Sequence, residues 1–259
     1  FEDLPKEFED YTITQISDIH SGSFDNKAKV EYAVDLINAQ ASDAIMFTGD
    51  LVNSRSSEML PWKSTFSKLK AKDGIFSILG NHDYGDYTRW PTKEDKIKNF
   101  KDMLKLHKAL GFQLLLDEAK FIKKKESQLA IIGVENWGKW FKQKGDLRKA
   151  TSQVNPDDFK ILLSHDPSHW EHQVVDDQLH YHLTLSGHTH GMQFGIEIPG
   201  FIKWSPIKWR YKYWAGLYEK AGQVLNVNRG FGYLAFPGRV GIWPEITVIK
   251  LKKGKSHLG

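Results

Sequence analysis

"LTLSGHTHG" at residues 183–191 takes an apolar, β-rich run directly into a turn that carries two histidines between glycines. Ligands of α/β sheets bind in the crevice outside the carboxyl ends of the strands. A strand that ends in His188 and His190 therefore predicts a ligand site at the edge of a sheet. The fold prediction depends on whether other strands of the chain end in the same way.

Four more apolar runs end in turns that hold side chains of the kinds that bind metals. They are SDIH with Asp18 and His20, GD with Asp50, GNHD with Asn81, His82 and Asp83, and SHD with His165. Alone, GD is an ordinary turn and SHD fits a helix N-cap. Together the five turns would gather oxygen and imidazole groups in one crevice, and such a cluster would be costly to bury without a cation.

The remaining pattern indicates an α/β fold in a single domain. Helices are expected over 29–40, 58–71 and 94–110, with strands at 11–17, 43–50, 74–83, 119–125, 129–136, 159–166, 182–190, 223–230 and 245–253. Early alternation of strand and helix, followed by strand-rich sequence, favours two packed sheets with helices outside, the four-layer αββα arrangement. We expect the domain to span 11–253, between an N-terminal extension (1–10) and a C-terminal tail (254–259).

Composition limits the chemistry. Apolar residues make up 40% of the 259 residues, which is enough for a substantial core. The absence of cysteine excludes disulfides and thiolate metal sites. A metal bound by His, Asp and Asn would be zinc, manganese or iron. The net charge of +4 permits anionic partners without requiring them.

The sequence contains no apolar stretch of transmembrane length and no recognisable signal peptide. It begins with Phe1 rather than Met. We therefore expect that an upstream segment, either an address or an anchor, belongs to the protein. This expectation favours a membrane-associated or extracytoplasmic bacterial protein and leaves its localisation open.

Taken together, the five motifs resemble those of the calcineurin-like metallophosphoesterases, whose signature is D-x-H, G-D, G-N-H-D/E, H and G-H-x-H. All five blocks are present in this order between residues 11 and 250. The resemblance implies the αββα fold and two divalent metal ions (Mn, Zn or Fe). The metal ligands that it implies are Asp18, His20 and His190 for the first ion, Asn81, His165 and His188 for the second, and Asp50 for both.

The resemblance also implies the reaction, which is hydrolysis of a phosphoester or pyrophosphate bond by in-line attack of a metal-bridging hydroxide. Asp50 and His82 would be catalytic, with His82 stabilising or protonating the leaving oxygen. Many phosphatases of the family place an aspartate three residues after the G-D aspartate to orient this histidine, and here that position is Asn53. An amide cannot stabilise an imidazolium as a charge does, so we favour diesters over monoesters.

Two further features bear on the substrate. Arg229, in NRGFG, is a candidate phosphate clamp, although a surface salt bridge explains it equally well. Residues 201–218 combine basic and aromatic side chains without an acidic residue. They fit a loop packed on the sheet, a contact with a membrane surface, or stacking on nucleic-acid bases.

The late NRG block and the aromatic-basic insert resemble a bacterial subgroup that includes UDP-diacylglucosamine pyrophosphohydrolases, often behind an N-terminal membrane segment. We therefore expect a small or lipid-linked phosphate substrate. A nuclease or phosphomonoesterase on the same metal core is an alternative, with nucleic acid the less favoured partner. A non-catalytic scaffold is an alternative of another class, and the sequence leaves the oligomeric state open.

Overall fold

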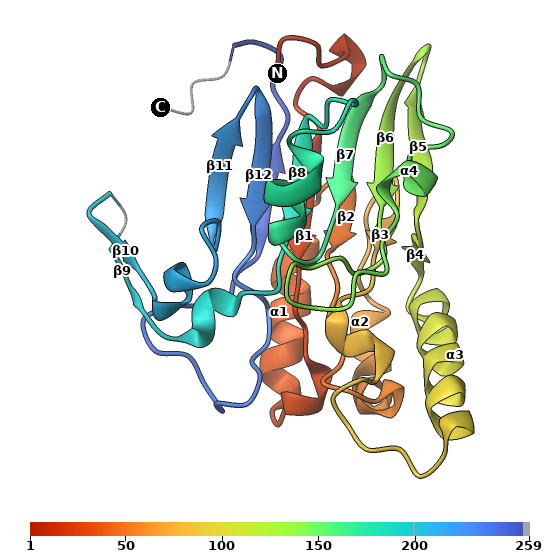
Figure 1. Ribbon diagram of the computed structural model, residues 1–259, viewed down its shortest axis with the longest axis vertical. Coiled ribbons are helices and arrows are strands. Elements are labelled where there is room, and N and C mark those ends of the chain that lie inside the picture. The colour runs from red at the N-terminus through yellow and green to blue at the C-terminus, as the bar shows by residue number, and fades with distance from the viewer. Residues whose placement is uncertain (199, 256–259) are drawn as a thin grey trace.

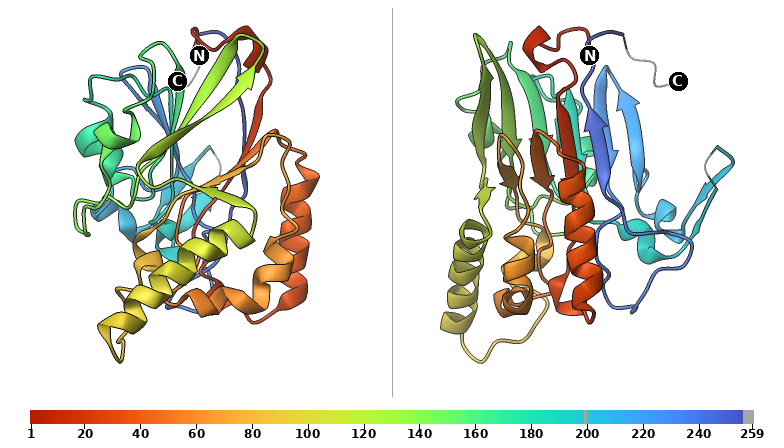
Figure 2. Two further views of the ribbon diagram at one scale, coloured as in Figure 1. Left: turned by 90° about the vertical axis from the view of Figure 1, so that its right-hand side faces the viewer. Right: turned by 180° about the vertical axis from the view of Figure 1, so that it is seen from behind.

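Two β-sheets pack face to face between outer layers of helices, as the computed structural model shows for residues 1–198 and 200–255 (Figure 1). The predicted α/β class and the four-layer αββα arrangement are confirmed. The helical layers are unequal, since long helices cover one sheet and only short helical segments cover the other (Figure 2). The predicted tail lies outside the described residues from position 256 on.

The first sheet has the strand order β13-β1-β2-β3-β4. Its strands are β1 (Thr12–Ile16), β2 (Ala44–Phe47), β3 (Ile75–Ser77), β4 (Phe112–Leu114) and β13 (Thr247–Lys250). β1 to β4 are parallel, and β13 pairs antiparallel with β1. The helices α1 (Lys27–Ala39), α2 (Lys63–Phe66) and α3 (Lys93–Ala109) lie on its outer face.

The second sheet has the order β11-β12-β8-β7-β6-β5. Its strands are β5 (Glu118–Lys124), β6 (Ser127–Gly133), β7 (Phe159–Leu163), β8 (Leu183–Ser186), β11 (Gly216–Lys220) and β12 (Gln223–Val227). The four central strands are parallel, and the two edge strands are antiparallel. Its outer face carries α4 (Leu147–Ala150) and the π-helical turn η5 (Trp170–Val174).

The remaining elements are short. They are the 3-10 turns η1 (Lys6–Phe8), η2 (Ser21–Ser23), η3 (Ser56–Trp62), η4 (Asn81–Tyr84), η6 (His190–Gln193) and η7 (Pro206–Trp209), and the separate hairpin of β9 (Ile196–Ile198) and β10 (Ile202–Trp204). Residues 1–10 pack against the two sheets, where Leu4 and Phe8 are fully buried among the residues of the core between them.

Buried aliphatic side chains between the sheets hold them together. Ile13 and Met46 from the first sheet join Ile161 and Leu185 from the second in one cluster, all fully buried. Each buried side chain of this size contributes about 1.5–3 kcal/mol relative to an exposed one. This core fixes the two sheets relative to each other, and therefore the turns that follow their parallel strands.

Local signals set the helix boundaries. The Thr92 hydroxyl accepts the Asp95 N–H at 3.0 Å and the Asp95 carboxylate accepts the Thr92 N–H at 3.2 Å, which forms a capping box at the start of α3. Gly111, with φ +81°, follows its end and confirms the predicted C-terminal stop. The helix predicted over 58–71 is wrong in most of its length. That segment forms η3 and the four-residue α2 instead, and Pro61, which has no N–H to donate, lies within η3.

None of the helices in the described residues is long and apolar enough to cross a membrane.

Acid is expected to destabilise the protein through His107. Its fully buried ring lies against Phe47 and Phe112, Nε2 has no hydrogen-bond partner within the described residues, and burial lowers its pKa from 6.5 to about 3. The unfolded chain therefore binds more protons between these pKa values, and stability falls as the pH falls from 6.5 toward 3. From pH 7 to 5 the loss through one such histidine is about 2 kcal/mol. Urea unfolding of wild type and His107→Gln at both pH values measures it, and equal pH dependence in the two proteins would contradict this role.

Candidate metal centre

Two clusters of metal-ligand side chains converge at the carboxyl ends of the parallel strands. Asp18, His20 and His190 form the first cluster, and Asp50, His165 and His188 form the second. Within each cluster the potential ligand atoms lie within 4.8 Å of one another. The predicted strand ends therefore do meet, and they combine residues that follow β1 and β2 of one sheet with residues that follow β7 and β8 of the other.

Asp50 lies between the clusters. Its Oδ2 is 3.5 Å from Nε2 of His20 and 3.2 Å from Nε2 of His165. Its other oxygen, Oδ1, accepts the backbone N–H of His82 at 2.9 Å. One carboxylate oxygen thus faces an imidazole of each cluster, while the other fixes the turn that contains His82.

The backbone at these ligands is unusual. Five of them adopt left-handed φ values, a region that few non-glycine residues occupy: Asp18 (51°), His20 (47°), Asp50 (60°), His188 (73°) and His190 (51°). Backbone of this kind costs free energy and gathers at active sites, where the surrounding structure enforces it. The repetition at five residues indicates that the turns are shaped to aim the side chains inward.

Two glycines allow the turns to approach one another. A Cβ atom at Gly80 would lie 2.1 Å from Oδ1 of Asp50, and one at Gly187 would lie 1.9 Å from Oγ of Ser17 and 2.3 Å from Oδ2 of Asp18. Neither position has room for a side chain. Glycine is therefore required in both the GNHD and the GHTHG turn.

Three buried atoms, two in the first cluster and one in the neighbouring GNHD turn, have no hydrogen-bond partner within the described residues: Nε2 of His20, Nε2 of His190 and Oδ1 of Asn81. The Asn81 amide nitrogen donates to the Tyr87 hydroxyl at 2.9 Å, which leaves its oxygen directed elsewhere. Unsatisfied buried polar atoms are costly, and divalent cations bound at this site would satisfy them. The donor set of imidazole, carboxylate and amide oxygen fits zinc, manganese or iron.

The protonation states of Asp50 and His20 suit cation binding, whereas His165 carries a proton that a cation must displace. Burial would raise the pKa of Asp50, but the nearby imidazoles, His165 above all, hold it well below its usual value, so the carboxylate is charged. Burial lowers the pKa of His20 to about 3, which keeps that ring neutral with a free lone pair. Burial opposes charge on His165 as well, yet Asp50 and Asp18 raise its pKa to about 10. A cation binding there would have to displace that proton, so metal binding is expected to release protons.

In His165 and His188, the ring nitrogen that faces away from the second cluster also has a hydrogen-bond partner. His165 Nδ1 donates to the Thr48 carbonyl at 2.7 Å, and His188 Nε2 lies 2.8 Å from the Tyr211 hydroxyl, which donates to Asp166 at 3.1 Å. Such outer contacts fix the tautomer and the orientation of metal-binding imidazoles. The sequence did not single out Asp166 or Tyr211 for this role.

Asp83 is a third supporting residue whose role the sequence did not indicate. Its buried carboxylate accepts backbone N–H groups from Asp50 at 2.9 Å, Leu51 at 2.8 Å and Gly80 at 2.9 Å. It therefore ties the GD turn to the GNHD turn and positions Asp50 without facing a cation. Its position within the GNHD motif was the signal from which the sequence could have predicted this role.

His82 lies beside the clusters without belonging to either. Its Nδ1 donates to the Asn53 backbone carbonyl at 2.7 Å, and its ring stacks on Tyr87 with centroids 4.3 Å apart. Because a carbonyl can only accept, the proton on Nδ1 is fixed and Nε2 is left for another partner. The Asn53 side chain does not hold this ring. Its Oδ1 lies 3.2 Å from Nδ1 of His20 instead.

Arg229 is not brought to the metal ligands. Its guanidinium forms ion pairs with Glu197 of β9 and, at 2.5 Å, with Glu245. Both carboxylates therefore compete with any phosphate for this side chain. The structure matches the salt-bridge interpretation of Arg229 and gives no support to a phosphate clamp.

A cleft of about 230 Å³ opens over the clusters. Side chains that include His82, Phe141, Ile207, Arg210 and Leu234 line it. A volume of this size fits a phosphoryl group and little more, so the rest of a larger substrate would extend past the rim.

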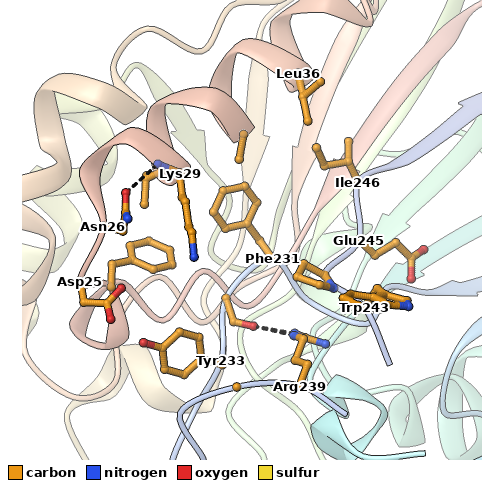
Figure 3. A pocket seen from close by; sticks show the side chains of 16 residues that line it. Asp25, Asn26, Lys29, Leu36, Phe231, Tyr233, Arg239, Trp243, Glu245 and Ile246 are labelled. Atoms are coloured by element: carbon orange, nitrogen blue, oxygen red, sulfur yellow. Dashed lines mark hydrogen bonds between the residues drawn. The ribbon is translucent and has the colours of Figure 1, made fainter. Parts of the chain in front are cut away.

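A second, larger cavity of about 740 Å³ lies between α1 and the segment 231–246 (Figure 3). Its lining is mostly apolar, with Lys29, Glu245 and Arg239 among its charged groups. Arg239 lines this cavity and also contacts the first metal-ligand cluster, because its guanidinium lies 3.4 Å from Nδ1 of His190. None of the metal-ligand clusters found in the described residues opens into this cavity. The chemistry therefore belongs to the smaller cleft.

Comparison with known proteins agrees with this geometry. A sequence model of the calcineurin-like phosphoesterase family matches residues 11–192. The chain is 28% identical to the metallophosphoesterase YkuE of Bacillus subtilis over 255 residues, which cover 96% of this chain and 82% of that protein. It is 27% identical to a zebrafish (Danio rerio) transmembrane protein with metallophosphoesterase domain, covering 97% of this chain and 55% of the relative. The chain thus spans about half of that relative.

Among solved structures, the sulfate thiohydrolase SoxB of Thermus thermophilus resembles this chain with a TM-score of 0.51 at 11% identity. The likeness covers 96% of this chain and 58% of SoxB, and at this identity it shows the shared fold alone. The family match includes all five ligand-bearing turns that the structure brings together. The chain belongs to the calcineurin-like phosphoesterase family.

Proposed function

We propose that this protein is a dinuclear metal-dependent hydrolase of phosphodiester or pyrophosphate bonds in small or lipid-linked substrates. The observation that carries the proposal is the position of Asp50, with one oxygen 3.5 Å from His20 and 3.2 Å from His165. A carboxylate in that position can be shared by two cations. Asp18 and Asp50 would supply two negative charges, so a centre with two divalent ions keeps a positive charge that attracts phosphate.

The ligands would divide as the two clusters do. Asp18, His20 and His190 would hold one ion, and His165, His188 and the Asn81 oxygen would hold the other, with Asp50 shared. When bound, a pair of such ions lowers the pKa of water and orients phosphoryl oxygens for in-line displacement. The protein contributes a rigid ligand frame, since the outer nitrogens of His165 and His188 are already hydrogen-bonded.

His82 would act on the leaving group. Its Nδ1 is occupied by the Asn53 carbonyl, so Nε2 is the atom that could hold or donate a proton at the leaving oxygen. The partner of Nδ1 is neutral, whereas a carboxylate would stabilise a charged ring. This arrangement favours diesters and pyrophosphates, whose leaving groups need less protonation than those of alkyl monoesters.

The test is a substrate panel with metal-reconstituted protein. Bis-p-nitrophenyl phosphate, p-nitrophenyl phosphate, a nucleotide-sugar pyrophosphate and DNA are compared after loading with Mn²⁺, Zn²⁺ or Fe²⁺. We expect diesters or pyrophosphates to be hydrolysed faster than the monoester, and a chelator to abolish the activity reversibly. Hydrolysis of the monoester alone would refute the preference. A folded protein that binds none of these ions would refute the metal mechanism and favour a scaffold.

A nuclease remains the alternative that a specific observation supports. Residues 201–218 expose Lys208, Trp209 and Arg210, of which Arg210 lines the cleft, and bases could stack on such a surface. Binding to a polyanion weakens steeply with added salt, whereas binding of a small diester does not. Measuring KM for DNA and for bis-p-nitrophenyl phosphate across a range of salt concentrations separates the two functions.

A further inference from the structure

The hairpin of β9 and β10 projects from the edge of the molecule and belongs to neither large sheet (Figure 1). Its strands pair antiparallel, with Ile198 opposite Ile202, Glu197 opposite Lys203, and Ile196 opposite Trp204. Since side chains alternate between the two faces of a strand, the isoleucines and Trp204 share one face, and Glu197 and Lys203 share the other.

The polar face is fixed to the protein body. Glu197 forms an ion pair with Arg229, and the Lys203 ammonium donates to the Ala215 carbonyl and lies 5.2 Å from the centre of the Trp214 ring. These contacts determine which way the hairpin faces. Its apolar face is therefore held away from the body, where the core cannot cover it.

That outer face is exposed and continuous. Ile196 is 53% exposed, Ile198 50% and Ile202 48%, Phe194 continues the same alternation at 50%, and Phe201 beside the turn is 88% exposed. Single exposed apolar side chains are common, but a contiguous group of this kind marks a surface that contacts something else. A two-stranded hairpin is only marginally stable in isolation, so these apolar side chains do not serve to build a hydrophobic core for the hairpin itself.

The neighbouring surface is basic and aromatic. Trp209 of η7 is 76% exposed, and Trp204 packs edge-on against it with centroids 6.2 Å apart. Lys208 and Arg210 flank Trp209 and are exposed, and the chain has no acidic residue from 198 to 218. Aromatic rings beside cations match the boundary between anionic headgroups and acyl chains.

We propose that the apolar face of the β9–β10 hairpin inserts into the surface of an anionic lipid bilayer. Each strand has three residues and is about 10 Å long, so the hairpin can lie at the membrane interface but is far too short to cross the ~30 Å hydrocarbon core. The inserted residues are aliphatic and aromatic, while the cations stay at headgroup level. Of this hairpin, β10 lies within residues 201–218, where the sequence indicated a membrane contact, and β9 precedes them.

Docking in this way would place the metal cleft at the membrane surface. Ile207 and Arg210, which adjoin the exposed Trp209, also line the cleft. A lipid-linked phosphate could then enter while its chains stay in the bilayer. The docking itself does not depend on the proposed function, because it follows from the hairpin surface alone.

The test is co-sedimentation of the protein with vesicles of phosphatidylcholine and phosphatidylglycerol, and with vesicles of phosphatidylcholine alone. Wild type should bind the anionic vesicles. The double variant Ile198→Ser/Phe201→Ser should bind them at least about tenfold more weakly, because two large apolar side chains no longer leave water. Lys208→Glu should weaken binding to the anionic vesicles selectively. The matched control, Tyr32→Ser, removes a 65% exposed ring on α1 and should bind as wild type does.

Hydrolysis of bis-p-nitrophenyl phosphate in solution is measured in the same samples. We expect equal rates in wild type and the double variant, since neither residue lines the cleft. Wild type that ignores anionic vesicles, or a double variant that binds them as wild type does, would overturn the docking. A double variant that changes self-association in sedimentation velocity instead would assign the hairpin to a second copy of the chain. Failure of all proteins to hydrolyse the diester would count against the proposed function and leave the docking result intact.

Discussion

Replacing Asp50 with alanine is expected to remove metal from both clusters and to slow phosphodiester hydrolysis by at least about 10³-fold. Bound cations stabilise the transition state of such reactions by several kcal/mol, which corresponds to a factor of this size. Asp50 is the one side chain of the two clusters whose oxygen lies near an imidazole of each, at 3.5 Å from His20 and 3.2 Å from His165. Loss of most other ligands would weaken one cluster, whereas loss of Asp50 weakens both.

Asp50→Asn separates the charge of this residue from its shape. The amide oxygen can still accept the His82 N–H that Oδ1 accepts at 2.9 Å, so the GNHD turn keeps its anchor. The negative charge that two cations would share is lost. We therefore expect a folded protein that also retains little metal.

Elemental analysis of metal-loaded, desalted protein measures both variants, alongside turnover of bis-p-nitrophenyl phosphate and a circular dichroism spectrum. Asp25→Ala is the matched control, because this exposed carboxylate follows the turn of Asp18 and His20 but lines the larger cavity rather than the metal cleft. It should keep wild-type metal content and rate. Full metal content in folded Asp50→Ala would show that the carboxylate is not a shared ligand.

Much of the fold could be predicted because its elements carry strong local signals. α1 and α3 are long and amphipathic, and α3 has both a capping box and a terminal glycine. The strands β4, β9 and β10 have three residues each, too few for alternation to be distinguished from an ordinary loop. Segment 58–71 carries apolar residues at helical spacing, but the chain forms the 3-10 turn η3 around Pro61 and only the four-residue helix α2 after it.

The ligands of the centre could be predicted because each follows a strand, and parallel strands end on the same side of a sheet. The supporting residues Tyr211 and Asp166 could not be predicted. Tyr211 is one of several aromatic residues in 201–218, and its contacts with His188 and Asp166 exist only in three dimensions. Arg229 could not be assigned from the sequence, which fits a phosphate clamp and a salt bridge equally well, whereas the structure pairs it with Glu197 of the hairpin and with Glu245.

Replacing His82 with alanine is expected to leave metal content unchanged and to slow hydrolysis of substrates with poor leaving groups by about 10²–10⁴-fold, the usual effect of losing a general acid. The ring belongs to neither ligand cluster. Its Nδ1 is fixed by the Asn53 carbonyl at 2.7 Å, so its contribution must come from Nε2 at the leaving oxygen. p-Nitrophenolate departs with little protonation. The loss should therefore be much smaller for a p-nitrophenyl diester than for an alkyl diester.

Asn53→Ala is the control that isolates this role. Alanine keeps the backbone carbonyl that holds His82, so the dependence of rate on the leaving group should match wild type. The variant loses the amide oxygen 3.2 Å from Nδ1 of His20, so any effect should appear in metal retention instead. Rates for both diesters and metal content are measured in wild type and both variants. An equal loss for both leaving groups in His82→Ala would rule out proton donation. A collapse of its metal content would show that His82 binds or positions a cation, because only such a residue can change how much metal is retained.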